Sequence, residues 1–267
     1  MSIARVLPGP PGTRFSAITH VTETGSTNAD LLAAAARGEP EGVVRVTDHQ
    51  TAGRGRQGRS WQDEPGNSML MSVLLRPAAA VAPLVPLISG LAVTDGLNHL
   101  LAGPDEPEPV PVWAALKWPN DVLVPVLGER KVCGILAEAT TAGATGGRLV
   151  VVSGMGLNIR FTSPPPHEIA QRAATLEELA GRPVDRWDVV AAVLTHFERW
   201  LTVAEASPAA VLDGYRGRCL TIGRTVRMQT ATGVLEGVAS AVADSGGLVI
   251  DTAAGPVTVT AGDAHHI

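Results

Sequence analysis

Cysteines, long apolar runs and a secretion signal are scarce or absent in this sequence. Only two of its 267 residues are cysteines, Cys133 and Cys219, and they lie too far apart to form a metal-ligand motif. Such a pair is typical of free thiols in a reducing compartment. No uninterrupted run of about 18 apolar residues predicts a membrane span, and the N-terminus has no apolar signal stretch. We therefore expect a cytoplasmic protein without membrane contact.

Charge is sparse as well. Charged residues make up 18 % of the chain, and 21 basic against 26 acidic residues give a net charge of −5. This balance argues against a protein that coats nucleic acid, although a local basic site remains possible. A hydrophobic content of 45 % allows a sizeable core.

Against this background one segment stands out, the sequence GRGRQGRSW at 53–61. Arginines are permanent cations whose planar groups match carboxylate and phosphate oxygens. Glycines let the backbone turn tightly and approach a ligand. Charge repulsion and glycine entropy argue against a packed loop until an anion arrives. We interpret the segment as a loop that closes over an anionic ligand; the alternative is a solvated surface loop.

The loop also satisfies the dinucleotide pattern G-x-G-x-x-G through Gly53, Gly55 and Gly58. That pattern requires a helix to begin at once, with an acidic residue about 20 positions on. Here residues 61–66 read as a turn, and 68–75 read as a strand. A nicotinamide oxidoreductase is therefore rejected.

Periodicity predicts an α+β chain with a second, smaller domain. A loose lead-in at 1–17 precedes a strand at 18–22 and a helix that Thr27 caps and Gly38 ends. We then predict strands at 43–48, 68–75, 113–118, 122–126, 132–138 and 149–153, with a loop at 104–111. Helices are predicted at 83–101, 168–180, 187–205 and 208–216. Short strands at 225–229, 233–242, 247–252 and 256–260 indicate a small SH3-like barrel that begins near 217.

Several polar residues lie where these elements end. Ser26 and Thr27 could cap their helix or offer hydroxyls to a ligand. Gln50 combines a donor and an acceptor, which suits a ureido or amide group. Asp121, in a turn with Lys117 and Asn120, could hold magnesium beside nucleotide phosphates, or could belong to an ordinary Asn-Asp turn.

The strand at 132–138 opens with a lysine. Lys131 could extend to solvent or lie at the mouth of a pocket, where Gly134 would leave room for a ligand. Gly154 and Gly156, at alternate positions, would clear one face of a strand. No side-chain nucleophile is evident.

Five motifs together resemble one known family, the biotin–protein ligases, which are grouped with the lipoate ligases. They are ETGSTN at 23–28, QTAGRGRQGRSW at 50–61, KWPND at 117–121, KVCGILAE at 131–138 and GMGLN at 154–158. The resemblance runs from about residue 23 to the end. It implies a mixed β-sheet flanked by helices, related to class II aminoacyl-tRNA synthetases, at 18–216. A small SH3-like C-terminal domain is implied at 217–267.

The resemblance also implies a role for each matched residue. Lys131, Arg54 and Arg56 would be catalytic, beside the carboxylate and the α-phosphate. The biotin-binding residues would be Ser26, Thr27, Asn28, Gln50, Gly53, Arg54, Arg56, Lys131, Gly134, Gly154 and Gly156. The nucleotide-binding residues would be Arg56, Arg59, Trp61, Lys117, Asn120 and Asn158, with Trp61 stacked on adenine and Asp121 near Mg²⁺.

The activity implied is ATP-dependent formation of biotinyl-adenylate, with release of pyrophosphate. Biotin would then pass to a lysine of a biotin carboxyl carrier domain. The short segment before the first predicted strand leaves no room for a helix-turn-helix, so we expect no DNA binding. Two alternatives are a lipoate ligase and a non-catalytic biotin or nucleotide sensor. The Ser26, Thr27 and Gln50 set favours a ureido ring, and Lys131 with the complete loop argues against a sensor.

Overall fold

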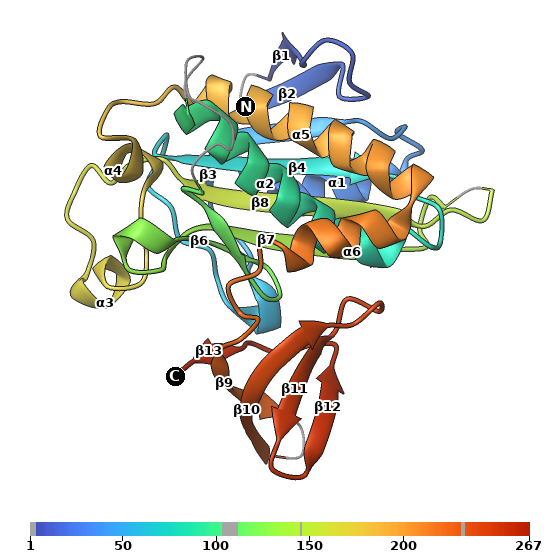
Figure 1. Ribbon diagram of the computed structural model, residues 1–267. Coiled ribbons are helices and arrows are strands. Elements are labelled where there is room, and N and C mark those ends of the chain that lie inside the picture. Colours follow the sequence, from blue (N-terminus) through green and yellow to red (C-terminus); the bar gives the residue numbers. More distant parts are fainter. Residues whose placement is uncertain (1–3, 103–111, 145, 231–232) are drawn as a thin grey trace.

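The computed structural model describes residues 4–102, 112–144, 146–230 and 233–267. The loop predicted at 104–111 lies outside the described residues. Two β-sheets, one large and one small, organise the chain, and helices cover the large one (Figure 1).

The large sheet has the strand order β1-β2-β3-β4-β8-β7-β6-β5. Strands β2 and β3 pair in parallel, with Ile18 opposite Val44, and the other neighbours are antiparallel. The predicted mixed sheet is therefore confirmed. Its strands are β1 (Arg5–Pro8), β2 (Ala17–Thr24), β3 (Val44–Gln50), β4 (Ser68–Leu75), β5 (Ala115–Lys117), β6 (Asp121–Val124), β7 (Arg130–Thr140) and β8 (Val150–Asn158).

Helices cover both faces of this sheet (Figure 1). The helices α2 (Val85–Ala102), α5 (Arg186–Ala206) and α6 (Pro208–Arg216) lie on one face, and α1 (Thr27–Ala36) packs on the other. Every residue of β4 is buried. Met69, Met71 and Val73 join the core under α2 and α5, whereas Leu74 joins the small core under α1. A strand with both faces covered explains the mostly apolar sequence at 68–75.

Residues 82–102 are long and apolar enough to cross a membrane by length and composition, with a mean hydropathy of 1.3. Two thirds of this segment is buried inside the fold, at 67 %. A Cβ on Gly96 would lie 3.1 Å from the backbone nitrogen of Val193, so α2 and α5 are in close contact. The segment is therefore packed in the core of the fold, as the core helix of a globular protein is.

Three local predictions were wrong. The lead-in contains β1, which pairs with β2 from Arg5↔His20 to Pro8↔Ala17. The helix expected at 168–180 divides into α3 (His167–Ala170) and α4 (Leu176–Ala180). Between them, Lys131 accepts a backbone hydrogen bond from Ala174 and donates one to Arg172, which pulls this segment out of helical geometry. The third concerns the cap of α1, where Ser26, not Thr27, is the N-cap residue.

The small sheet has the order β12-β11-β10-β9-β13, all antiparallel, and forms the predicted SH3-like domain. Its strands are β9 (Thr225–Thr230), β10 (Gly233–Val242), β11 (Leu248–Thr252), β12 (Gly255–Val259) and β13 (His265–His266). Trp118 joins the two sheets, because its backbone N–H donates to Thr221 and its indole N–H donates to the carbonyl of Gly246. This docking brings residues 262–265 beside the large sheet.

The two thiols provide a test of the core. Cys133 and Cys219 are free and buried. Burial raises the pKa of Cys133 to about 12, while nearby Lys131 opposes the shift and Asp121 adds to it; burial also raises the pKa of Cys219. An unfolded thiol has a pKa of about 8.5. Both cysteines should therefore resist iodoacetamide from pH 7 to about 9 in the folded protein and react once it unfolds.

The same shift makes a pH prediction. The pKa of Cys133 is higher in the folded than in the unfolded chain, so keeping this thiol protonated favours the fold. This contribution to stability is complete below about pH 8.5 and is lost as the pH rises towards 12. Mass spectrometry of the alkylated protein, with and without guanidinium, measures the labelling. Rapid labelling of either cysteine in the folded chain would contradict the burial described here.

Candidate active site

One cavity, of about 180 Å³, is lined by residues of β3, β4, β7 and β8, by the loops at 54–61 and 117–121, and by residues 263–265 of the small domain. Apolar walls come from Leu70, Ile135 and Met155, and polar groups surround them. The cavity brings together almost all of the residues that the motifs single out. These are Ser26, Thr27, Asn28, Gln50, Arg54, Arg56, Arg59, Trp61, Lys117, Asn120, Asp121, Lys131, Gly134, Gly154 and Gly156.

Two expected site residues do not line the cavity. Asn158 lies at the end of β8, where its Nδ2 donates to the carbonyl of Ala174 at 3.3 Å. Gly53 instead accepts a backbone hydrogen bond from Trp61 at 3.0 Å. A Cβ there would come within 2.6 Å of the carbonyl oxygen of Trp61 and 3.2 Å of Gln50 Nε2. Gly53 therefore permits the loop to close on itself, and Asn158 holds the segment after α3.

Polar side chains form a compact network at the α1 end of the cavity. Gln50 Oε1 lies 2.9 Å from the backbone nitrogen of Thr27 and 3.1 Å from its hydroxyl. The Thr27 hydroxyl is 2.7 Å from the hydroxyl of Ser72, on β4. Ser26 makes no side-chain capping bond. Thus Thr27 serves the cavity network, and simple capping does not explain these hydroxyls.

A β-bulge places Lys131 in the cavity. On β6, Val122 pairs with Cys133 whereas the next residue, Leu123, pairs with Lys131, so β7 has one extra residue at this point. Such a bulge redirects side chains that simple alternation would send to opposite faces. Lys131 and Gly134 consequently share the cavity face: a Cβ on Gly134 would lie 2.8 Å from Lys131 Nζ. Asp121, which pairs with Gly134, meets this ammonium at 2.6 Å.

The arginine loop, residues 53–61, folds as a small hairpin. Arg54 bridges to Ser60, Gly55 N donates to the carbonyl of Arg59 at 2.7 Å, and Trp61 N donates to the carbonyl of Gly53 at 3.0 Å. Gln57 (φ 55°) and Gly58 (φ 73°) form the tip in the left-handed region. Glycine adopts this conformation without steric cost, whereas for Gln57, which has a Cβ, it is unfavourable and is imposed by the tight turn of the hairpin.

Acceptors of the protein itself bind all three guanidinium groups of this loop. Arg54 pairs with Glu138 at 3.0 Å. Arg56 contacts Asn120 Oδ1 at 3.1 Å and Asp263 at 3.5 Å, and Arg59 forms an ion pair with the same Asp263. The expectation that the loop would not pack until an anion arrived was therefore wrong, because Glu138 and Asp263 provide negative charge within the chain.

Trp61 covers the glycines of the cavity. A Cβ on Gly156 would lie 2.6 Å from Trp61 Cε2, and a Cβ on Gly134 would lie 3.0 Å from Trp61 Cζ3. Lys131 Nζ sits 5.6 Å from the indole centroid, within range of a cation–π contact. A Cβ on Gly154 would meet Asn28 Oδ1 at 2.3 Å. These glycines therefore make room for Trp61, Lys131 and Asn28.

The segment after the arginine loop is anchored by two carboxylates. Glu64 accepts hydrogen bonds from Ser163, Thr162 and Asn67, which lower its pKa to about 2. Asp63 lies 2.9 Å from His49 Nδ1, at the end of β3; burial raises the pKa of Asp63, and the contact with His49 limits that rise. The contact of Asp63 with His49 ties the segment after the arginine loop to the strand before it, and Glu64 ties that segment to residues 162–163.

Sequence reasoning assigned no role to Ser72, Glu138 or Asp263. Glu138 belongs to the motif at 131–138, but nothing local shows that it meets Arg54, 84 positions away. Asp263 comes from the other domain and reaches the loop only through the docking of the two sheets. Their partners are set by tertiary structure, so a single sequence carries no direct signal for these contacts.

Comparison with known proteins agrees with this geometry. The profile of the Biotin/lipoate A/B protein ligase family matches residues 21–158, and that of the Biotin protein ligase C terminal domain matches 221–266. The chain belongs to the biotin/lipoate A/B protein ligase family. The resemblance drawn from the five motifs is thereby confirmed.

Relatives cover most of the chain. The biotin–[acetyl-CoA-carboxylase] ligase of Mycobacterium tuberculosis is 38 % identical over 96 % of this chain and 91 % of its own length. A Bacillus subtilis bifunctional ligase/repressor is 32 % identical, over 80 % of this chain but 62 % of its own length. The Aquifex aeolicus biotin protein ligase in complex with biotin and ATP superposes with a TM-score of 0.75, at 28 % identity, covering 93 % of this chain and 97 % of that one.

The contact between Trp61 and Gly156 makes a first prediction for the site. In Gly156→Ala, the new methyl group would clash with the indole and displace it from the cavity wall. Intrinsic tryptophan fluorescence should shift, and the affinity for ATP should fall by about tenfold, since base–aromatic stacking is worth about 1–3 kcal/mol. Isothermal titration calorimetry and fluorescence measure the two effects.

Gly25→Ala is the matched control, because a Cβ at Gly25 meets nothing within 4 Å. It should leave both the fluorescence and the ATP affinity unchanged. A Gly156→Ala protein with native fluorescence and native ATP affinity would disprove the importance of this packing.

The contact of Asp263 with the arginine loop makes a second prediction. Asp263→Ala removes the acceptor that the small domain gives to Arg56 and Arg59. Trypsin should then cut the loop several-fold faster, whereas the unfolding midpoint should change little, since ion pairs that are partly exposed, as these are, contribute only about 0–1 kcal/mol at a protein surface. Asp251→Ala changes an exposed carboxylate on β11 and should leave the cleavage rate unchanged. Equal cleavage of all three proteins would contradict the role given to Asp263.

Proposed function

We propose that this protein is an ATP-dependent biotin–protein ligase. It joins biotin and ATP to form biotinyl-adenylate and then transfers biotin to a lysine of a carrier protein. One observation carries the proposal: Lys131 and the arginine loop share one cavity with the polar network of Thr27 and Gln50. Cations suit an acid and a triphosphate, and the amide and hydroxyl groups suit a ureido ring. The named relatives above are biotin ligases, which favours biotin over lipoate.

The first step must bring two anions together. At 4 Å two unit negative charges repel by about 4 kcal/mol at an effective dielectric constant of about 20. The carboxylate oxygen of biotin attacks the α-phosphorus of ATP, the bond to the bridging oxygen breaks, and pyrophosphate leaves. Lys131 contacts the carboxylate and the α-phosphate, and Arg54 and Arg56 neutralise the charge that increases as the bond forms.

The nucleotide then competes with carboxylates of the protein. Arg56, Arg59, Lys117 and Asn120 bind its phosphates, so the phosphates take the place of Asp263 on the guanidinium groups. Trp61, already packed on the two glycines, presents the rest of its indole to adenine. Loop closure keeps water from the mixed anhydride. In the second step the carrier's ε-amine attacks the carbonyl carbon, AMP leaves, and an amide remains.

Magnesium fits this site through Asp121. Mg²⁺ on nucleotides is usually held by one or two carboxylates, with phosphate oxygens and water as the other ligands. Asp121 lies on the cavity wall, and its present partner is the ammonium of Lys131. The ion would supply further positive charge to the phosphates. No group of three or more acidic, histidine or cysteine side chains occurs within the described ranges, which suits an ion carried by the nucleotide.

The carrier, the compartment and the domain limits complete the proposal. The acceptor lysine belongs to a biotin carboxyl carrier domain of a carboxylase. The free, buried thiols favour a cytoplasmic location. The catalytic domain ends near 216 and the SH3-like domain occupies 217–267, a division supported by the two separate sheets. The catalytic domain includes β1, so it begins before residue 18.

Lys131→Ala tests the proposal directly. The unchanged protein, given biotin and α-labelled ATP, should form an adenylate and pyrophosphate, and lipoate should give far less. Lys131→Ala should slow adenylate formation by about 10²–10³-fold, as for loss of one transition-state donor. The fold should persist, because Lys131 is one third exposed. An unchanged adenylate yield would remove Lys131 from catalysis, and a preference for lipoate would overturn the choice of acid.

A further inference from the structure

A continuous chain of hydrogen bonds runs from the polar network to the arginine loop. The Thr27 hydroxyl meets Ser72 Oγ at 2.7 Å, and Ser72 Oγ donates to Asn28 Oδ1 at 2.6 Å. Asn28 Nδ2 donates to Glu138 Oε2 at 2.8 Å, and Arg54 NH2 donates to the same oxygen at 3.0 Å. One carboxylate oxygen therefore joins the end of α1 to the first arginine of the loop.

The number of hydrogens fixes the direction of this chain. Asn28 Nδ2 uses both of its hydrogens, on Glu138 and on the carbonyl of Leu136 at 3.0 Å, so Oδ1 must face Ser72. Oδ1 can only accept, and Ser72 therefore gives it its single hydrogen. The Thr27 hydroxyl has a single hydrogen, which its contact with Ser72 at 2.7 Å and its contact with Gln50 Oε1 at 3.1 Å must share. From Ser72 onwards the direction is fixed, because reversing Asn28 would turn its Oδ1 towards two acceptors, Glu138 and the carbonyl of Leu136.

Burial makes the chain rigid at one end and movable at the other. Thr27, Asn28 and Ser72 are almost fully buried, at 4 %, 4 % and 0 % exposure. The side chain of Glu138 is 26 % exposed and that of Arg54 is 44 % exposed. A fixed, buried network thus ends in a carboxylate that can hold or release the loop.

We propose that Glu138 is a positioning residue that couples the ring end of the cavity to the arginine loop through Arg54. The proposal rests on the function proposed above. A biotin ring held by Thr27 and Gln50 stabilises Ser72 and Asn28 in the arrangement that orients Glu138. Glu138 then holds Arg54 where Arg56 and Arg59 face the cavity. Biotin and nucleotide therefore each increase the affinity for the other, since coupling between two sites is reciprocal.

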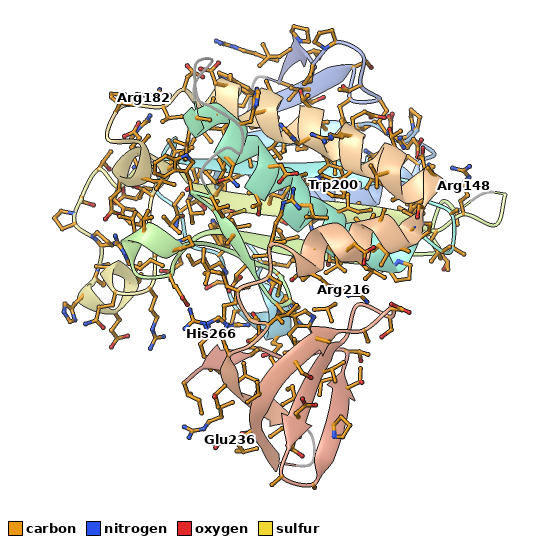
Figure 2. All side chains as sticks on the ribbon, in the orientation of Figure 1. Arg148, Arg182, Trp200, Arg216, Glu236 and His266 are labelled. Carbon is orange, nitrogen blue, oxygen red and sulfur yellow. The ribbon has the colours of Figure 1, made fainter. Side chains whose placement is uncertain are left out.

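An ordinary surface ion pair is the competing explanation. The pair Arg227–Glu236, between β9 and β10, has side chains that are 56 % and 47 % exposed. Glu236 lies on the small domain, away from the junction near His266 (Figure 2). Glu236→Gln is consequently a matched control for Glu138→Gln, because each substitution removes one carboxylate charge from an arginine and keeps an acceptor oxygen.

The test is a double-mutant cycle with Glu138→Gln and Arg54→Ala. Biotin affinity is measured by calorimetry with and without a non-hydrolysable ATP analogue, and KM and kcat are measured for adenylate formation. Glu138→Gln should raise KM for both substrates about tenfold, which lies within the usual range of coupling between sites, and should keep kcat within about twofold. It should also abolish the increase in biotin affinity that the ATP analogue gives. In an Arg54→Ala background it should have no further effect, because both act through one contact.

Several results would overturn the proposal. Additive effects of the two substitutions would show that Glu138 does not act through Arg54. An equal loss of coupling in Glu236→Gln would show a general effect of charge. Ser72→Ala removes the donor to Asn28, and full coupling in that variant would disconnect the ring end from Glu138.

The two proposals fail differently. If the unchanged protein forms no biotinyl-adenylate, the proposed function is wrong. The role of Glu138 can also be measured without enzymatic activity, as the rate at which trypsin cuts the arginine loop. Trypsin should cut the loop several-fold faster in Glu138→Gln than in Glu236→Gln. Equal rates would overturn the role of Glu138.

Discussion

The gathering of four positive charges at one cavity is the constraint on which this site depends. Lys131, Arg54, Arg56 and Arg59 converge on one cavity, where their mutual repulsion would open the loop. Three carboxylates oppose it: Asp121 meets Lys131, Glu138 meets Arg54, and Asp263 meets the other two. These pairs are partly exposed and therefore contribute little to global stability. Their effect is to hold the four cations at the cavity; in the proposed reaction the phosphates displace Asp263, whereas Glu138 keeps its contact with Arg54.

Backbone geometry makes this arrangement possible. The bulge in β7 turns Lys131 towards Gly134 and Asp121, and the opposite residue of β8 is Gly156. Without side chains at these two glycines, the indole of Trp61 lies against the sheet. The small domain adds Asp263 because Trp118 fixes its position against the large sheet. The positions of the cavity's charges thus depend on the sheet, on the loop and on the contact between domains.

Local patterns predicted a large part of this structure. The helix α6 has the predicted bounds because its ends are marked locally by Pro208 and Gly217. The mostly apolar strand β4 and the strands β9 to β12 of the small domain were also predicted from local patterns, whereas β13 was not. The break between α3 and α4 and the bulge at Lys131 could not be predicted, because each depends on pairing between distant segments.

Within the site, the motifs identified the cations but not their partners. The three arginines are visible in the sequence because they interrupt a chain with few charges. Glu138 and Asp263 are acidic residues among 26, and only the fold shows which cations they meet. Asn158 belongs to a matched motif but does not line the cavity, and its side chain donates to the carbonyl of Ala174.

A crystal structure with biotin and a non-hydrolysable ATP analogue tests the central claim most directly. The account predicts that Lys131 Nζ lies between the biotin carboxylate and the α-phosphate, and that Arg56 and Arg59 have exchanged Asp263 for phosphate oxygens. A complex in which these three cations keep their present partners or point into solvent, while both ligands occupy the cavity, would contradict it.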